Sequence, residues 1–201
     1  KSKKSKIQSM ELSSYHTHTK LCKHANGMPR DYLQEAKDFL QKENHTCLGF
    51  GFSDHCPYPN DGTDNWPEVR MTPEEAPNYI KTVRKASKNV DFPVLAGFEC
   101  EWDSVYKSWY KDFLLEELEA EYLVLGSHWI PHEKERLYLP NEAKNTKLFI
   151  KWVNLTLEAL DSGFFKIFAH PDLCFGGGLV WSKETESAFT DILSLCKDKN
   201  I

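Results

Sequence analysis

The chain has 201 residues, of which 40% are hydrophobic and 27% are charged, and its formal net charge at pH 7 is −5. This length is enough for one domain with a substantial core, and the composition is that of an ordinary soluble globular protein. The acidic balance argues against nucleic acid as a partner. The apolar runs are far too short to cross a bilayer, so no membrane contact is expected, and the oligomeric state stays open.

Residues 1–10 are expected to form a basic tail in front of a single domain at 11–201. Four of the first six residues are lysines, but no apolar stretch follows them, so the segment lacks the form of a secretory signal. The six cysteines are irregularly spaced and include no C-x-x-C pair. We therefore expect reduced thiols in a cytoplasmic protein, serving more often as small buried apolar side chains than as auxiliary metal ligands.

Short apolar runs alternate with longer amphipathic segments along the chain. The predicted strands are 12–18, 47–53, 94–100, 122–127 and 164–169. The predicted helices are 29–42, a segment that begins at Thr72, 108–118, 142–160 and 182–197. Pro29 suits the first turn of its helix, and the apolar side chains that follow recur at helical spacing. Strand–helix units in this order predict a parallel α/β sheet or barrel, with the loop 56–71 (which contains Trp66) overhanging a site.

Each predicted strand ends at a side chain that can bind a metal ion. In chain order these are His16 and His18, Asp54 and His55, Glu99 and Glu101, His128, and His170. Carboxyl ends of parallel strands meet at one edge of a sheet, where ligands bind, so we expect these side chains to converge. A lone histidine at a strand end is usually structural, but a repeat at every strand indicates a site. Imidazole and carboxylate together favour zinc, iron or manganese over calcium or magnesium.

The spacing within the first and third strands supports coordination. His16 and His18 are two residues apart, so on a strand they point to the same face. Glu99 can bridge two ions through its two oxygens, but Glu101 points the same way, so periodicity alone leaves that choice open. Asp54 is predicted to orient a metal ligand as a hydrogen-bond acceptor.

The segments YHTHTKLCKHANG, GFSDHCP, AGFECEW, LGSHWI and FAHPDL resemble, in order, the successive motifs of the PHP (polymerase and histidinol phosphatase) family. The resemblance is strongest to its histidinol-phosphatase branch and extends over roughly residues 12–175. It implies a distorted seven-stranded β/α barrel with metal ions at the carboxyl ends of the strands. It also implies a metal-dependent phosphomonoesterase that hydrolyses L-histidinol phosphate to L-histidinol and phosphate in histidine biosynthesis.

The resemblance further implies two or three divalent ions, with zinc as the first choice and iron or manganese as the others. The ligand sets that it implies for three ions are His16, His18 and Glu99; Glu99, His128 and His170; and His24 and His55. In this assignment the bridging carboxylate is Glu99 rather than Glu101.

One motif of the family is absent from this sequence. The family ends with a strand that carries Asp-x-His, whereas no Asp-x-His follows His170. We therefore expect a C-terminally incomplete barrel in which Ile201 begins the next strand. The predicted strands are too few to close a barrel of seven, so an unpaired sheet edge and an exposed apolar wall are expected.

Metal-assisted hydrolysis needs no serine or cysteine nucleophile. The expected attacking group is a hydroxide activated by the ions at Glu99, His128 and His170. Arg30 and Arg136 are the candidates for binding the substrate phosphate, although a solvated arginine is the commoner role. The glycine run 176–178 is a weaker candidate, because a flexible loop is its commoner role.

Four alternatives stay open at this point. An amidohydrolase also begins with His-x-His, but it usually carries a carbamylated lysine where this chain has Glu99. A nuclease of the same family is disfavoured because the acidic balance provides no track for a phosphate backbone. A protein-tyrosine phosphatase of the family has the same kind of ligands. A non-catalytic metal-binding relative is consistent with the missing Asp-x-His.

Overall fold

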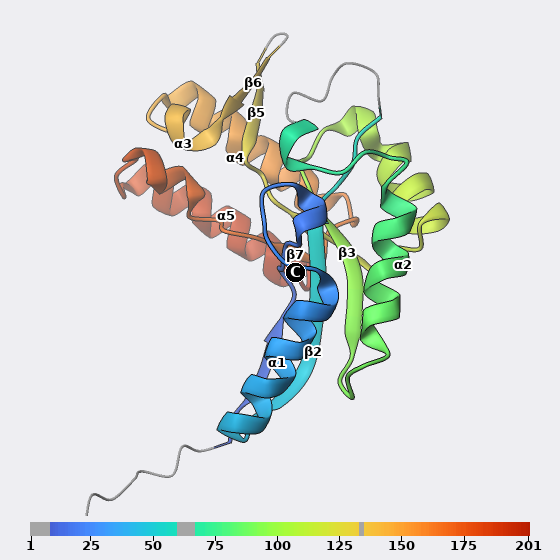
Figure 1. Cartoon of the computed structure of the whole chain (residues 1–201). Helices are drawn as coiled ribbons and strands as arrows, with labels where there is room; N and C mark the ends of the chain where they lie inside the picture. Colours follow the sequence, from blue (N-terminus) through green and yellow to red (C-terminus); the bar gives the residue numbers. More distant parts are fainter. Residues whose placement is uncertain (1–8, 60–66, 133–134) are drawn as a thin grey trace, which may run out of the picture.

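The computed structural model describes residues 9–59, 67–132 and 135–201. A curled parallel sheet of five strands in the order β1-β2-β3-β4-β7 forms its centre (Figure 1). The strands are β1 Glu11–Ser14, β2 Thr46–His55, β3 Val94–Cys100, β4 Tyr122–Leu125 and β7 Ile167–Phe168. The spatial order of the strands in this sheet is thus their order in the chain, and each strand runs parallel to its neighbours. The predicted α/β class is confirmed, and the sheet is an open half-barrel. Residues 1–8 of the predicted tail at 1–10 lie outside the described residues, as do residues 60–66 of the predicted loop 56–71, Trp66 included.

The predicted helices are present with shifted ends. The α-helices are α1 Pro29–Glu43, α2 Ala76–Ser87, α3 Leu139–Glu142, α4 Thr146–Asp161 and α5 Lys183–Lys199. A π-helix covers Trp109–Glu117, and short 3-10 helices cover Lys20–Cys22, Pro67–Val69, Ser104–Tyr106 and Leu173–Gly177. Helix α2 begins later than predicted because Thr72 and Glu75 form a preceding turn, in which the Thr72 N–H donates to the Glu75 carboxylate (2.8 Å).

Three sequence predictions of strands are corrected by the structure. The first strand pairs only as far as Ser14, so His16 and His18 lie beyond its end. The last strand is two residues long, and within the described residues it pairs with β4 alone. An antiparallel hairpin of β5 Trp129–His132 and β6 Glu135–Tyr138 was not predicted. Ile201 is not in a strand, because its N–H donates to the Cys196 carbonyl at the end of α5 (2.9 Å).

The alternation of side chains along β3 separates the core from the concave face. Phe98 is fully buried, and its ring centroid lies 5.2 Å from that of Tyr79 in the covering helix α2. The neighbouring Glu99 points to the opposite, concave face, because successive strand residues alternate between faces. Helix α2 packs on β3 and against α1, whereas α4 packs against α5 (Figure 1). The main core therefore lies between the sheet and the helices, and Glu99 lies on the concave face.

Two tyrosines fill the concave side of the sheet. The Tyr122 hydroxyl donates to the Tyr15 carbonyl (2.8 Å), and their rings meet edge to face with centroids 6.3 Å apart. A Cβ at Gly49 would overlap the Tyr15 hydroxyl, and one at Gly51 would overlap the Tyr122 hydroxyl. The glycines of β2 thus make room for the rings, which pack in a small second apolar cluster.

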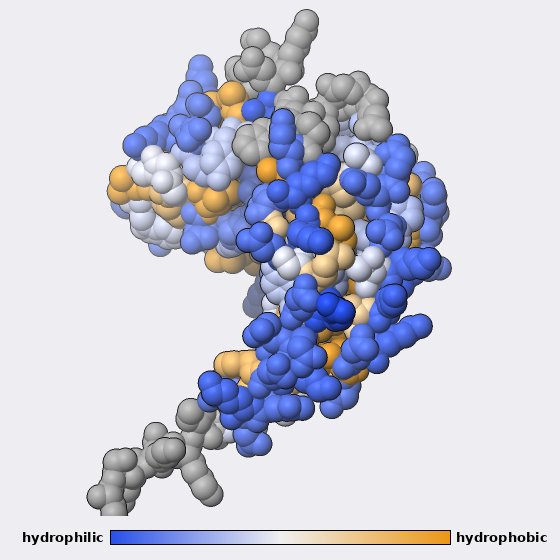
Figure 2. Space-filling view, in the orientation of Figure 1, coloured by the Kyte–Doolittle hydropathy of each residue, from blue (hydrophilic) through white to orange (hydrophobic). Residues whose placement is uncertain are grey.

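The surface divides into a hydrophilic and a more apolar part. The face over α1 and α2 is mainly hydrophilic, whereas hydrophobic residues gather on the part formed by α3, α4 and α5 (Figure 2). Exposed apolar side chains there include Ile150, Trp181 and Leu193. Among the described helices, none has both the length and the apolar composition of a membrane span.

The glycine run at 176–178 forms the end of a 3-10 helix, in contrast to the flexible loop considered from the sequence. Gly176 and Gly177 belong to the 3-10 helix Leu173–Gly177, and Gly178 ends that helix at a φ of 83°. A Cβ on Gly177 would overlap the carbonyl oxygen of Pro140 in α3, whereas one on Gly176 would meet only the Pro140 Cβ at 3.8 Å.

We therefore expect Gly177→Ala to destabilise the fold by about 1–3 kcal/mol, because backbone must move to relieve the overlap. Gly176→Ala, its neighbour in the same helix, is the matched control and should change stability by less than about 0.5 kcal/mol. Urea unfolding followed by circular dichroism measures both variants. Equal stability of the two would show that α3 does not approach the glycine run as closely as described.

Candidate metal centre

A buried carboxylate, Glu99, lies at the centre of the candidate site. Its side chain is 1% exposed. Five imidazoles surround it, with contacts to Oε1 from His170 Nε2 (2.9 Å), His16 Nε2 (3.3 Å) and His128 Nε2 (3.6 Å), and to Oε2 from His18 Nε2 (3.1 Å) and His55 Nδ1 (3.2 Å). These rings come from the carboxyl ends of β1, β2, β4 and β7, and Glu99 itself comes from β3. All the strands of the sheet thus contribute to one cluster.

The electrostatics of the cluster keep Glu99 ionised. Burial alone would raise its pKa, but hydrogen bonds from His16, His170 and His18 outweigh burial and hold the pKa well below its usual range. Burial lowers the pKa of His55 to about 2, so this ring stays neutral and can offer a lone pair. An ionised carboxylate beside a neutral imidazole is the form in which these two groups bind a metal ion.

The donor atoms are also spaced as a metal site requires. Nε2 of His16 and Nε2 of His18 lie 2.9 Å apart, and both face Glu99. Donor atoms of His16, Glu99 and His170 lie within 4.8 Å of one another. The buried Nδ1 of His170 has no hydrogen-bond partner in the described part of the chain. Oxygen and nitrogen donors that converge in this way fit a zinc, iron or manganese ion.

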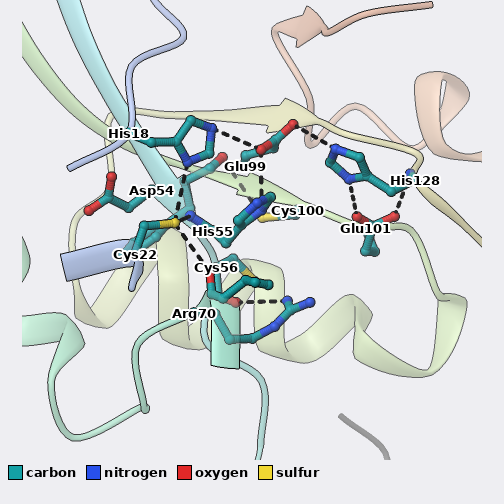
Figure 3. A network of polar contacts seen from close by, with 12 residues as sticks. His18, Cys22, Asp54, His55, Cys56, Arg70, Glu99, Cys100, Glu101 and His128 are labelled. Carbon is teal, nitrogen blue, oxygen red and sulfur yellow. Dashed lines mark hydrogen bonds and ion pairs between the residues drawn. The ribbon is translucent and has the colours of Figure 1, made fainter. Parts of the chain in front are cut away.

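Glu101 lies behind the cluster and holds His128 in place. Its two oxygens accept hydrogen bonds from the His128 backbone N–H (2.8 Å) and from Nδ1 of the ring (2.5 Å; Figure 3). Burial opposes protonation of this ring, but the Glu101 charge outweighs it and raises the pKa of His128 to about 9. Glu101 thus directs Nε2 of His128 toward Glu99, which distinguishes the roles of the two glutamates that periodicity left open.

Asp54 acts through a threonine rather than directly on a histidine. Its carboxylate is fully buried and accepts hydrogen bonds from the Thr19 N–H (2.5 Å) and the Thr19 hydroxyl (2.6 Å). Burial raises the pKa of Asp54 to about 6, although the Thr19 bonds oppose this shift. Within the described residues it bonds to none of the histidines, so the predicted direct contact with a metal ligand is corrected. It instead fixes the backbone that follows His18.

A second group of possible ligands lies beside the first. Donor atoms of His18, Cys22, His24 and His55 lie within 4.8 Å of one another. The ring centroid of His24 is 5.1 Å from that of His18 and 4.9 Å from that of His55. His24 thus reaches the cluster from the loop after β1, beside His18 and His55.

The arginines chosen from the sequence are engaged elsewhere. The Arg30 side chain is 80% exposed and lies 3.6 Å from Asp31, and the Arg136 side chain is 14% exposed and lies 3.5 Å from Asp103. In the described part of the chain neither guanidinium contacts a histidine of the cluster. They remain candidates for phosphate binding that the geometry does not favour.

Arg70, which the sequence analysis missed, lies closer to the cluster. It is buried, donates to the Cys56 carbonyl (3.2 Å), and its guanidinium carbon lies 5.0 Å from the centroid of the Tyr58 ring. Its charge opposes protonation of both His55 and His128, as a smaller effect than burial and the glutamate charges at these rings; Figure 3 shows Arg70 beside the cluster. No motif marks this arginine in the sequence, because it lies at the far end of the loop 56–71.

Comparison with known proteins identifies the family. The PHP domain matches residues 14–201, so the chain belongs to the PHP family. A curated relative from Deinococcus radiodurans, named as a histidinol-phosphatase, is 27% identical over 168 residues. This match covers 81% of the present chain and 61% of the relative, so the chain spans less than two thirds of that protein.

Two solved structures share the fold. One is a protein of Listeria monocytogenes described as a histidinol phosphatase, with a TM-score of 0.70 and 19% identity, covering 94% of this chain and 79% of that one. The other is histidinol phosphate phosphatase of Lactococcus lactis in complex with zinc, L-histidinol and phosphate. Its TM-score is 0.68 at 15% identity, and the match covers 95% of this chain and 71% of that one. The curled half-barrel described above therefore matches the fold of PHP-type β/α barrel proteins.

The Thr19–Asp54 contact generates a prediction about the cluster. Thr19→Val keeps the shape of the side chain but removes the hydroxyl, which leaves one oxygen of a buried carboxylate without its partner. We expect a loss of about 1–3 kcal/mol in the free energy of unfolding, measured with urea. Thr19→Ser keeps both hydrogen bonds and is the control. A serine variant as unstable as the valine variant would indicate that Thr19 acts through its methyl group instead.

Proposed function

We propose that this chain is the metal-binding part of a phosphomonoesterase that hydrolyses a small phosphate ester, with L-histidinol phosphate as the substrate and L-histidinol and phosphate as the products. The observation that carries this proposal is the ionised Glu99 carboxylate surrounded by five imidazoles. Membership of the PHP family supports it, as does the zinc, L-histidinol and phosphate complex of the Lactococcus lactis neighbour.

The proposed metal ligands are those of the two adjoining clusters: His16, His18, His24, His55, Glu99, His128 and His170. We propose two or three divalent ions, with zinc first because nitrogen donors predominate. Such ions, when bound, make a nucleophile available from water at neutral pH and neutralise phosphoryl oxygens.

The side chains around the ligands have supporting roles. Glu101 holds the ring of His128, and the Asp54–Thr19 pair holds the backbone after His18. The positive charge of Arg70, felt at His55 and His128, attracts a phosphate group to the same side of the cluster. Because its charge acts on two rings of the cluster, we favour Arg70 over Arg30 and Arg136 for binding the substrate phosphate.

The first test is the metal content of the purified protein. We expect elemental analysis to find zinc, iron or manganese, and the double substitution His16→Ala with His18→Ala to reduce it sharply, because two donors of one ion are lost. Removing single supporting groups from such sites typically costs about 10- to 100-fold in affinity, so losing two ligands should cost more. His45→Ala, which removes an imidazole that bonds the Met10 N–H instead, is the control. Unchanged metal content in the double variant would refute the site.

The second test separates the two glutamates by activity. Phosphate release from L-histidinol phosphate should fall by orders of magnitude in Glu99→Gln, because the central carboxylate contacts every ring of the inner cluster. Glu101→Gln should have a milder effect, since it changes only the support of His128. The opposite ranking would mean that Glu101 is the bridging group.

The same phosphate-release assay distinguishes L-histidinol phosphate from the other candidate substrates. Protein that spans the full family length is incubated with L-histidinol phosphate, a phosphotyrosine peptide and single-stranded DNA. Turnover of the peptide or the DNA in preference to L-histidinol phosphate would redirect the proposal to a protein phosphatase or a nuclease. Tightly bound metal with no turnover of any of them would indicate a non-catalytic metal-binding protein.

A further inference from the structure

One thiol lies inside the histidine cluster. Cys22 is the last residue of the 3-10 helix Lys20–Cys22, and its side chain is fully buried. Its sulfur lies 3.3 Å from Nδ1 of His18, 2.9 Å from the backbone nitrogen of His55 and 3.3 Å from the Val69 carbonyl (Figure 3). It therefore touches the chain after β1, the end of β2 and the segment that precedes Arg70.

The surroundings of this sulfur differ from those of the other buried thiols nearby. Cys56 Sγ donates to the Pro57 carbonyl (3.2 Å), and Cys100 Sγ lies 3.9 Å from the Phe98 carbonyl. The sulfur of Cys22 also donates, to the Val69 carbonyl, but in addition it accepts a hydrogen bond from the His55 backbone N–H. A group that donates to sulfur stabilises negative charge on it, which is what a thiolate ligand needs.

The neighbouring histidines leave a place for a third donor. Nε2 of His18 faces Glu99, so this ring is committed to the first ion. Nδ1 of His24 lies 3.2 Å from the Cys22 carbonyl, which leaves its Nε2 for an ion. His24 and His55 alone would supply two donors, fewer than the three protein ligands of a typical catalytic zinc site. The Cys22 sulfur lies within 4.8 Å of donor atoms of both rings.

We propose that Cys22 is a direct ligand, as a thiolate, of the ion held by His24 and His55. The inference rests on the proposed metal centre and adds a sulfur donor to it. Without metal, the S–H group of Cys22 donates to the Val69 carbonyl (3.3 Å). Binding of a dication replaces this proton, which leaves to the solvent, by a metal–sulfur bond. The sulfur makes this position select zinc, cobalt or iron over manganese.

Cobalt spectroscopy tests this assignment without reference to catalysis. Metal is removed from the protein with a chelator, Co²⁺ is added stepwise, and the absorption spectrum is recorded. A cobalt–thiolate bond gives an intense charge-transfer band in the near ultraviolet, whereas nitrogen and oxygen ligands give only weaker visible bands. We expect the near-ultraviolet band in the wild-type protein and its loss in Cys22→Ser, with the visible bands retained. Cys56→Ser, which removes an equally buried thiol, should keep the band.

The other outcomes separate this inference from the proposed function. Co²⁺ binding with visible bands and no charge-transfer band would overturn the thiolate ligand and leave the metal centre standing. A band that persists in Cys22→Ser would assign the sulfur to another cysteine and likewise overturn it. Absence of Co²⁺ binding would overturn both proposals. If Cys22→Ser does not fold, the ¹¹³Cd chemical shift of the cadmium-loaded wild-type protein is measured instead. A strongly downfield shift would support a sulfur ligand, and its absence would overturn the proposal.

Discussion

The burial of one negative charge governs the arrangement of this half-barrel. A carboxylate that is 1% exposed would cost several kcal/mol without partners, and Glu99 recovers that cost only if the imidazoles reach it. Those imidazoles come from the ends of β1, β2, β4 and β7, so they meet only when the strands are parallel and in register. Folding of the sheet and formation of the site are therefore coupled.

A second layer of contacts fixes the inner rings. Glu101 holds His128 by its backbone and its ring, and the Asp54–Thr19 pair holds the chain after His18. Each of these pairs joins residues from different strands or loops, so the inner geometry depends on tertiary structure. The site is thus rigid where it must present donor atoms, which is the condition for binding ions without a large cost in ordering.

Sequence reasoning succeeded where the physical signal is local. β3 was predicted with its observed bounds because a continuous apolar run ends at Glu99, and the strand-end histidines were found by their position. The hairpin β5–β6 was missed because the segment after His128 shows neither alternation nor a glycine turn. The Asp54–Thr19 pair joins residues 35 positions apart and the Cys22–His55 contact joins residues 33 positions apart, while Arg70 reaches the Cys56 carbonyl across 14 positions of an irregular loop. Such contacts leave no periodic trace in one sequence.

The tyrosines on the concave side have a consequence for how the family can vary. The Tyr122 hydroxyl occupies the space that a Cβ on Gly51 would need, and the Tyr15 hydroxyl does the same at Gly49. A larger residue at either glycine therefore requires a smaller side chain in place of the tyrosine that faces it. Each glycine and its tyrosine are thus expected to change together. Covariation between these positions among related sequences would report the filling of the barrel interior, independently of any residue that binds metal.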